Sequence, residues 1–236
     1  MIDLSLIWIL IIGLGVLIYV VLDGFDLGIG ILFPFISDRQ ERDVMMNTVA
    51  PVWDGNETWM VLGGAGLFAA FPLVYSTVLS ALYMPIILMV IALIFRGVAF
   101  EFRFKANKTK HLWDQAFIWG SILSSFLQGV ILGAYIQGIE TTNGIYTGGG
   151  LDWLTPFSLF TGISVVVLYA TLGCGWLIFK TEKMLQNRMF ELMPKLLISL
   201  LMIFVCVSIY TPLAHPQIAE RWFSQPQLFY FSPVPV

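Results

Sequence analysis

The sequence is poor in charge. Only 11% of its 236 residues are charged, 58% are hydrophobic, and the mean hydropathy is +0.85, whereas soluble domains carry about 25% charged and about 45–50% apolar residues. This composition excludes a soluble globular domain. Several apolar runs reach the ~20 residues that a helix needs to cross a bilayer, and the alternation typical of barrel strands is absent. We therefore expect an all-α fold, a polytopic transmembrane helical bundle.

Residues that ligate metals and haem are equally scarce. Histidine occurs only at His111 and His215, which we expect in a loop and in the C-terminal tail, so that two histidines within the membrane are not available to ligate a haem. Cys174 and Cys206 fall inside apolar runs and are predicted to pack as free thiols. The sequence contains no Walker-type loop, dinucleotide fingerprint, zinc spacing or basic patch for nucleic acid. We expect no cofactor and no metal on this chain.

Six apolar runs are predicted to span the membrane. They cover residues 4–21 with an apolar extension to 36, 52–71, 78–100, 113–136, 157–179 and 196–211. Because Asp3 stands where a signal peptide would carry basic residues, the first run is predicted to be a retained helix. The connection 137–155 is rich in Gly, Thr and Asn and is predicted to be an exposed loop. The Pro-rich tail from Ala214 carries no helix signal.

The basic residues predict the orientation of the chain. Ten of them lie in the first, third and fifth connections: Arg39, Arg42, Arg103, Lys105, Lys108, Lys110, Lys180, Lys183, Arg188 and Lys195. The second and fourth connections contain none. By the positive-inside rule, these ten residues face the cytoplasm, and the N-terminus lies outside.

Two pairs of carboxylates lie in or beside the apolar runs. Asp23 and Asp26 are three residues apart and therefore share one face of a helix, and the same holds for Asp54 and Glu57. A carboxylate at membrane depth costs roughly 2.5–3.5 kcal/mol, which makes such residues functional candidates. Two neighbouring carboxylates rarely ionise at once, and a chain of them can pass protons. The alternatives are a Gly-rich helix end for the first pair and an aqueous helix mouth or a cap for the second.

Two further ionisable residues accompany the third apolar run. Arg96 lies inside it and is a possible charge partner for the acids, although an arginine near a span end can instead extend to the membrane surface. Glu101 is also a candidate, with a solvated ion pair to the nearby Arg103 as its alternative. Glycines in the stretch 24–30 are predicted to let a neighbouring helix approach closely.

Four stretches carry a family resemblance. They are Asp-Gly-Phe-Asp-Leu-Gly-Ile-Gly at 23–30, Thr-Val-Ala-Pro-Val-Trp-Asp-Gly-Asn-Glu-Thr-Trp at 48–59, Gly-Gly-Ala-Gly-Leu-Phe-Ala-Ala-Phe-Pro at 63–72 and Phe-Arg-Gly-Val-Ala-Phe-Glu-Phe-Arg at 95–103. Together they closely resemble subunit II of the cytochrome bd-type quinol oxidases, especially the cyanide-insensitive branch. The match is specific over roughly residues 1–140 and looser beyond.

The resemblance implies a subunit of a bacterial terminal oxidase, which oxidises quinol and reduces dioxygen to water at the inner membrane. It implies that the b-type and d-type haems, or only b-type haems, and the quinol site belong to subunit I. This chain would be the partner in a heterodimer that stabilises subunit I, delivers protons, contacts membrane lipid and binds no nucleic acid. No catalysis is expected of the chain alone. The candidates for the proton pathway are Asp54, Glu57, Glu101, Asp23 and Asp26.

The chain departs from the family pattern in length. Family members usually have eight spans in two four-helix units, whereas six are predicted here. We expect an N-terminal four-helix unit at 1–137 and an incomplete second unit at 138–236, truncated at the C-terminus. The alternative functions are a proton-coupled membrane transporter or channel, which the buried acids alone would also fit, and an inactive structural remnant.

Overall fold

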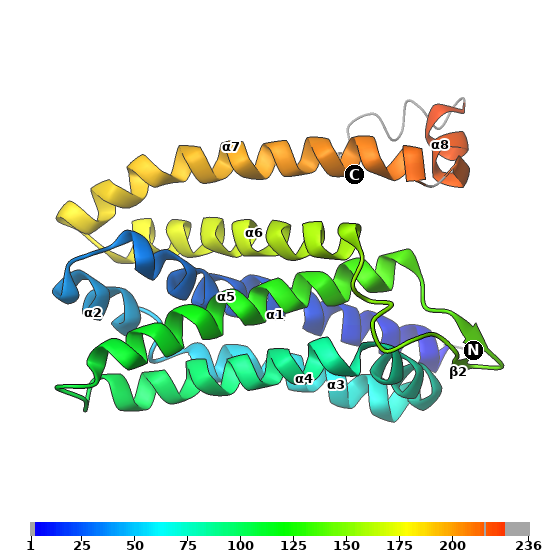
Figure 1. Cartoon of the computed structure of the whole chain (residues 1–236), viewed down its shortest axis with the longest axis horizontal. Coiled ribbons are helices and arrows are strands. Elements are labelled where there is room, and N and C mark those ends of the chain that lie inside the picture. The colour runs from blue at the N-terminus through cyan, green and yellow to red at the C-terminus, as the bar shows by residue number, and fades with distance from the viewer. Residues whose placement is uncertain (1–2, 215, 225–236) are drawn as a thin grey trace. The chain divides into compact units, whose positions relative to one another are not determined.

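A computed structural model describes residues 3–214 and 216–224 and is almost entirely helical (Figure 1). The chain divides into two compact units, residues 1–193 and 194–236. The long helices of the first unit are α1 (Leu4–Leu32), α3 (Trp53–Ala70), α4 (Pro72–Arg103), α5 (Lys110–Gln137) and α6 (Pro156–Lys180). A 3-10 turn (Phe33–Phe35) and the short helix α2 (Arg39–Asn47) connect α1 to α3.

Helices α1 and α5 form the centre of the first unit. Helix α1 contacts α3, α5 and α6, while α5 also contacts α4 and α6, and α3 lies against both α1 and α4. The first half of α1 is mostly exposed, and its buried residues concentrate between Asp23 and Leu32. The second half of α1 is therefore surrounded by the other helices of the unit.

Glycines bring α1 close to its neighbours, as the sequence predicted. A Cβ built on Gly28 would lie 1.9 Å from the backbone oxygen of Tyr169, and one built on Gly173 of α6 would lie 2.5 Å from the backbone of Gly28. Such distances leave no room for any side chain, so α1 and α6 touch backbone to backbone at this level. This contact fixes the rotation of α1 and thereby the direction of its polar side chains.

Five helices are long and apolar enough to cross a membrane: Leu4–Phe35, Pro72–Arg103, Lys110–Gln137, Pro156–Lys180 and Lys183–Ala214. The prediction of a polytopic transmembrane helical bundle is thus confirmed. The second predicted span, 52–71, forms helix α3, which has 18 residues but a polar first half. It is not among the five, because the residues from Trp53 to Glu57 lower its hydropathy.

Several helix limits differ from the predictions. Helix α5 begins at Lys110, so His111 lies exposed in its first turn and not in a loop. The loop predicted at 137–155 contains a small antiparallel hairpin of β1 (Thr141–Thr142) and β2 (Ile145–Tyr146). Asn143 and Gly144 form its turn with φ of 54° and 79°, the left-handed conformation that a two-residue hairpin turn requires.

The tail after Ala214 was wrongly predicted to lack a helix. Helix α7 covers Lys183–Ala214, and α8 follows at Pro216–Phe223. Proline was counted as a helix breaker, but at the first position of a helix its missing N–H costs nothing and its fixed φ favours the helical conformation. His215 and the Pro-rich residues after 224 lie outside the described part of the chain. The division into units at 137/138 stays a prediction.

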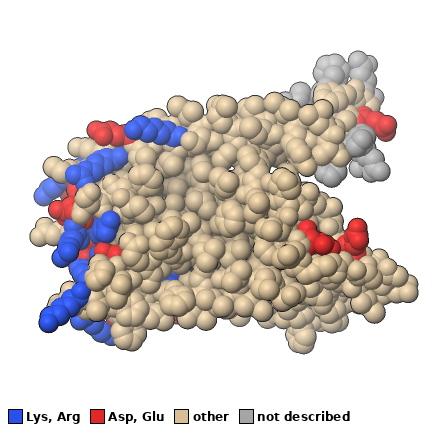
Figure 2. Space-filling view, in the orientation of Figure 1, with Lys and Arg blue, Asp and Glu red and all other residues tan. Residues whose placement is uncertain are grey.

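Lysine and arginine side chains gather at one end of the helices (Figure 2). In the first unit these residues lie on α2, at the end of α4, at the start of α5, at the end of α6 and at the start of α7. Successive long helices run in opposite directions, so the connections that carry basic residues all lie at the same end of the unit. We call it the basic end.

Candidate functional site

Arg96 of α4 is completely buried and faces three carboxylates from two other helices. Its Nη1 atom lies 3.1 Å from Asp23 Oδ1 and 3.5 Å from Glu57 Oε2, and its Nη2 atom lies 4.0 Å from Asp26 Oδ2. We call Asp23, Asp26, Glu57 and Arg96 the interior charge cluster. The structure thus brings the first predicted acid pair, on α1, and Glu57 of the second pair, on α3, to the predicted charge partner on α4, whereas Asp54 lies outside this cluster.

Aromatic rings hold the guanidinium in place. Arg96 Cζ lies 5.9 Å from the ring centroid of Trp53 and 5.6 Å from that of Phe100, and these two rings stack with centroids 4.9 Å apart. Gly97 contributes by the absence of a side chain, since a Cβ there would lie 3.3 Å from the Trp53 ring. The rings exclude water from one side of the guanidinium and attract its charge.

The hydrogen bonds of the interior charge cluster are incomplete. Asn56 donates to Asp26 Oδ2 at 2.8 Å. Both oxygens of Asp23, the other oxygen of Asp26, and Nε and Nη2 of Arg96 are buried without a hydrogen bond. Buried polar atoms are normally hydrogen-bonded, and their exceptions concentrate where water, protons or ligands act. These atoms of the cluster could therefore form further hydrogen bonds.

The charges in this cluster are also unequal. Three carboxyl groups face one guanidinium, and a low dielectric makes it costly for neighbouring carboxylates to ionise together. The cluster therefore holds more acidic groups than its one guanidinium can neutralise.

A groove at the surface reaches Glu57, one member of the interior charge cluster. It has a volume of about 420 Å³, lies between α3 and α4, and is lined by Trp53, Asp54, Glu57 and Gly97 among others. Asp54 is exposed, the Glu57 side chain retains 22% of its exposure, and Asp23 and Asp26 have none. The carboxyl groups thus form a series from the surface to the interior.

The alternative role of Asp54 as a helix cap finds no support in the geometry. Helix α3 has Val52 as its N-cap, without a side-chain hydrogen bond, and Asp54 lies inside the first turn. The structure places Asp54 in the groove, three residues from Glu57 on the same helix. Whether these two carboxyl groups share a proton stays a prediction.

Glu101 lies outside the interior charge cluster. It is exposed, and its Oε2 atom lies 3.5 Å from Nζ of Lys105, which comes four residues later, just after the end of α4. The ion pair expected with Arg103 is absent, because residues four apart face each other on a helix whereas residues two apart do not. Glu101 follows Gly97 of the groove by one turn, on the basic-end side.

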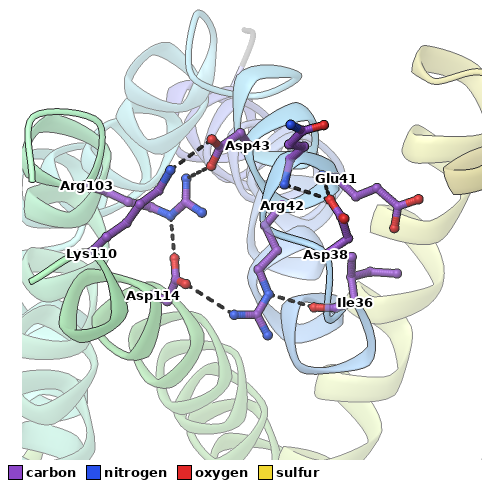
Figure 3. Close-up of polar contacts among 9 residues, drawn as sticks. Ile36, Asp38, Glu41, Arg42, Asp43, Arg103, Lys110 and Asp114 are labelled. Atoms are coloured by element: carbon purple, nitrogen blue, oxygen red, sulfur yellow. Dashed lines mark hydrogen bonds and ion pairs between the residues drawn. The ribbon is translucent and has the colours of Figure 1, made fainter. Parts of the chain in front are cut away.

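A second charged group was not anticipated from the sequence (Figure 3). Arg103 is completely buried and pairs with Asp114 of α5 and, at 2.6 Å, with Asp43 of α2. Lys110 pairs with Asp43 at 2.9 Å, and Arg42 pairs with Asp114 at 3.2 Å. These five residues are called the basic-end network. The sequence feature that could have indicated this network is Asp114, an acidic residue within a predicted apolar run.

The basic-end network connects α2, α4 and α5. Arg42 also donates through Nε to the backbone oxygen of Ile36 at 2.7 Å, which fixes the turn that follows α1. Partial burial acts to raise the pKa of Asp43, but the hydrogen bonds from Lys110 and Arg103 hold it below the ordinary value of an aspartate. The network is a structural clamp between α2, α4 and α5.

No metal-binding group of three or more His, Cys, Asp or Glu side chains occurs within residues 3–214 and 216–224. Among those residues histidine occurs once, as His111 in the exposed first turn of α5. Cys174 and Cys206 are free thiols, as predicted.

Comparison with known proteins gives one consistent result. The family model described as cytochrome bd terminal oxidase subunit II matches residues 4–236. The chain is 34% identical over 197 residues to the cytochrome bd-I ubiquinol oxidase subunit 2 of Escherichia coli K12, covering 78% of this chain and 51% of the relative. It is 32% identical over 195 residues to the cytochrome bd ubiquinol oxidase subunit 2 of Bacillus subtilis, covering 80% and 57%. The chain spans about half the length of the curated relatives it matches.

Proposed function

Because the chain belongs to the cytochrome bd terminal oxidase subunit II family, we propose that it serves as subunit II of a bacterial quinol oxidase that reduces dioxygen to water. Its partner is the haem-bearing subunit I, and the complex lies in the inner membrane. The haems of the partner supply the redox chemistry. This chain stabilises the partner and handles protons, and it performs no catalysis alone.

The observation that carries the proton role is the series of carboxyl groups from the groove to Arg96. Reduction of dioxygen to water consumes protons, and these must cross an apolar region that water does not fill. In this proposal Asp54 would exchange protons at the groove, Glu57 would pass them inward, and Asp26 would receive them beside the pair of Asp23 with Arg96.

The basic end sets the direction of this pathway. The positive-inside rule puts the basic end in the cytoplasm. Glu101 lies on that side of the groove, one turn beyond Gly97, and is exposed. It is therefore the carboxyl group nearest the cytoplasmic entry along α4, and protons would pass from Glu101 to Asp54 and Glu57. Exposed and buried acids would act in sequence.

A proton-coupled transporter would also use buried acids paired with an arginine. The family membership favours the oxidase, and a redox spectrum separates the two functions. We expect haem to purify with this chain only when the haem-bearing subunit is co-expressed, because no histidine of the described bundle interior is available as a ligand. Visible spectra of the purified chain, with and without the partner, measure this. Stoichiometric haem on the chain alone would contradict the assignment, and a co-purified complex without haem would favour the transporter.

A further inference from the structure

Three polar side chains form a hydrogen-bonded chain in the bundle interior. Tyr169 of α6 donates through its hydroxyl to Gln128 Oε1 of α5 at 2.8 Å, and Gln128 donates through Nε2 to the hydroxyl oxygen of Tyr19 of α1 at 2.7 Å. We call these residues the tyrosine chain. Tyr19 and Tyr169 are 6% and 1% exposed, so water does not compete for these bonds.

The backbone of α1 is shaped to admit the tyrosine chain. A Cβ built on Gly24 would lie 2.9 Å from the ring of Tyr169, so only glycine at this position leaves space for the ring. Gly129 of α5 likewise lets α6 approach the helix that carries Gln128, since a Cβ built there would lie 2.5 Å from the backbone oxygen of Thr161. The same glycine run that flanks Asp23 and Asp26 therefore also positions this tyrosine.

The donors of the tyrosine chain all point in one direction. Tyr169 donates to Gln128 and Gln128 donates to Tyr19, which leaves the proton of the Tyr19 hydroxyl free for a further acceptor. Asp23 follows Tyr19 by four residues on α1, so the two side chains lie on the same face of that helix. Neither oxygen of Asp23 accepts a hydrogen bond from another group, although one of them pairs with Arg96. Tyr19 is thus the donor placed to satisfy Asp23.

We propose that Tyr19 is a positioning residue that keeps Asp23 as the ionised partner of Arg96, so that Asp26 and Glu57 are the groups that change protonation during turnover. A hydrogen bond to a carboxylate stabilises the ionised form. Asp26 instead accepts from Asn56 alone, and Glu57 faces the groove. This inference rests on the proposed function and assigns separate roles within the interior charge cluster.

The ionisable groups that face Asp23 are known for each neighbouring helix. They are Tyr19 and Asp26 on α1, Glu57 on α3, Arg96 on α4 and Tyr169 on α6, while α5 contributes the neutral Gln128. Replacing Tyr19 by Phe removes its hydroxyl donor and leaves the charge and nearly the volume of the site unchanged. The substitution Tyr19→Phe therefore tests the proposal.

The test measures oxygen consumption against pH in the haem-replete complex with subunit I. Without the Tyr19 donor, Asp23 takes up a proton more readily, and Arg96 must then pair with Asp26 or Glu57. We expect the acidic limb of the Tyr19→Phe profile to move to higher pH by about one unit, the size of one hydrogen bond to a charged group. Tyr169→Phe and Gln128→Leu should cause smaller shifts in the same direction. Tyr135→Phe, an exposed tyrosine of α5, is the matched control and should cause none.

The outcomes separate this inference from the proposed function. A Tyr19→Phe profile that coincides with the unmodified one, at unchanged haem content, overturns the positioning role. If Tyr19→Phe does not assemble, the Gln128→Leu and Tyr169→Phe profiles decide by the same criterion. Glu57→Gln tests the proton role itself: unchanged turnover in that variant overturns the proposed function, whereas reduced turnover together with an unshifted Tyr19→Phe profile overturns this inference alone.

Discussion

Two arginines on one helix illustrate two uses of a buried charge. Arg96 and Arg103 are seven residues apart on α4, about two turns, and both are completely buried. Arg103 belongs to a network of three cations and two carboxylates, in which each oxygen of Asp43 and Asp114 pairs with a cation. Arg96 instead faces three carboxyl groups alone.

The difference teaches how to distinguish a structural charge from a functional one. In the basic-end network the charges nearly balance and every carboxylate oxygen has a partner. Protonation of Asp43 or Asp114 would therefore break the ion pairs of the network. In the interior charge cluster acids are in excess and several oxygens lack hydrogen bonds. In the proposed function this cluster would gain or lose a proton and remain assembled. The following substitutions are expected to affect the two groups differently.

The largest effect is expected for Arg96→Gln. Removing the only cation leaves Asp23 buried without a countercharge, and breaking a buried ion pair from one side costs about 3–5 kcal/mol. The amount of complex extracted from membranes should fall to a small fraction of normal. Arg96→Lys, which keeps the charge, is the control and should retain part of it. Normal yields of Arg96→Gln would show that the cluster does not depend on its arginine.

A smaller effect is expected for Asp114→Asn, on the stability of the protein and not on its turnover. This change removes one carboxylate from both Arg103 and Arg42 and should destabilise the protein by about 3 kcal/mol. Thermal unfolding of the purified complex measures the loss. Asp38→Asn is a matched control, because Asn replaces Asp well as the N-cap of α2. Turnover per haem should stay unchanged, and a selective loss of turnover would remove the distinction between the two arginines.

The smallest effect concerns the pH dependence of the basic-end network. The pKa of Asp43 is lowered, so its ion pairs stabilise the folded protein fully at a pH above 3.8, the ordinary pKa of an aspartate. This stabilisation is lost as the pH falls through the lowered pKa of the folded protein. Unmodified protein should therefore be more stable than Asp43→Asn at pH 6, and the difference should vanish in strong acid. Thermal unfolding between pH 6 and pH 3 measures it. A difference that grows on acidification would contradict the assignment.

Much of the fold follows from the sequence because the membrane imposes simple rules. Apolar length predicted the helices, and the cost of charge in lipid predicted that Asp23, Asp26 and Arg96 would require partners. The predicted span at 52–71 forms a helix, but α3 carries polar residues in its first half and is not among the five helices apolar enough to cross a membrane. The helix α8 was missed because proline was read only as a breaker.

The remaining contacts depend on the rotation of helices about their axes. Arg103 was interpreted as a topology signal and as a possible partner of Glu101, whereas it pairs with Asp114, an acid in the next apolar run. The pair of Glu101 with Lys105 follows from helical spacing and was predictable. The tyrosine chain joins residues of α1, α5 and α6 that are far apart in sequence. Only the glycine contacts between the helices, which set their rotation, bring them together.

The most direct test of the proton role is the oxygen consumption of the Asp54→Asn complex with full haem content. Asn keeps the size and polarity of the side chain but cannot exchange a proton, and Asp54 is the exposed carboxyl group of the groove. The account predicts that turnover falls by roughly 100-fold while haem content and assembly persist, since a lost acid–base group typically costs this much. Glu140→Gln, an exposed acid away from the groove, should leave turnover unchanged. An assembled, haem-replete Asp54→Asn complex that consumes oxygen at the unmodified rate would contradict the central claim.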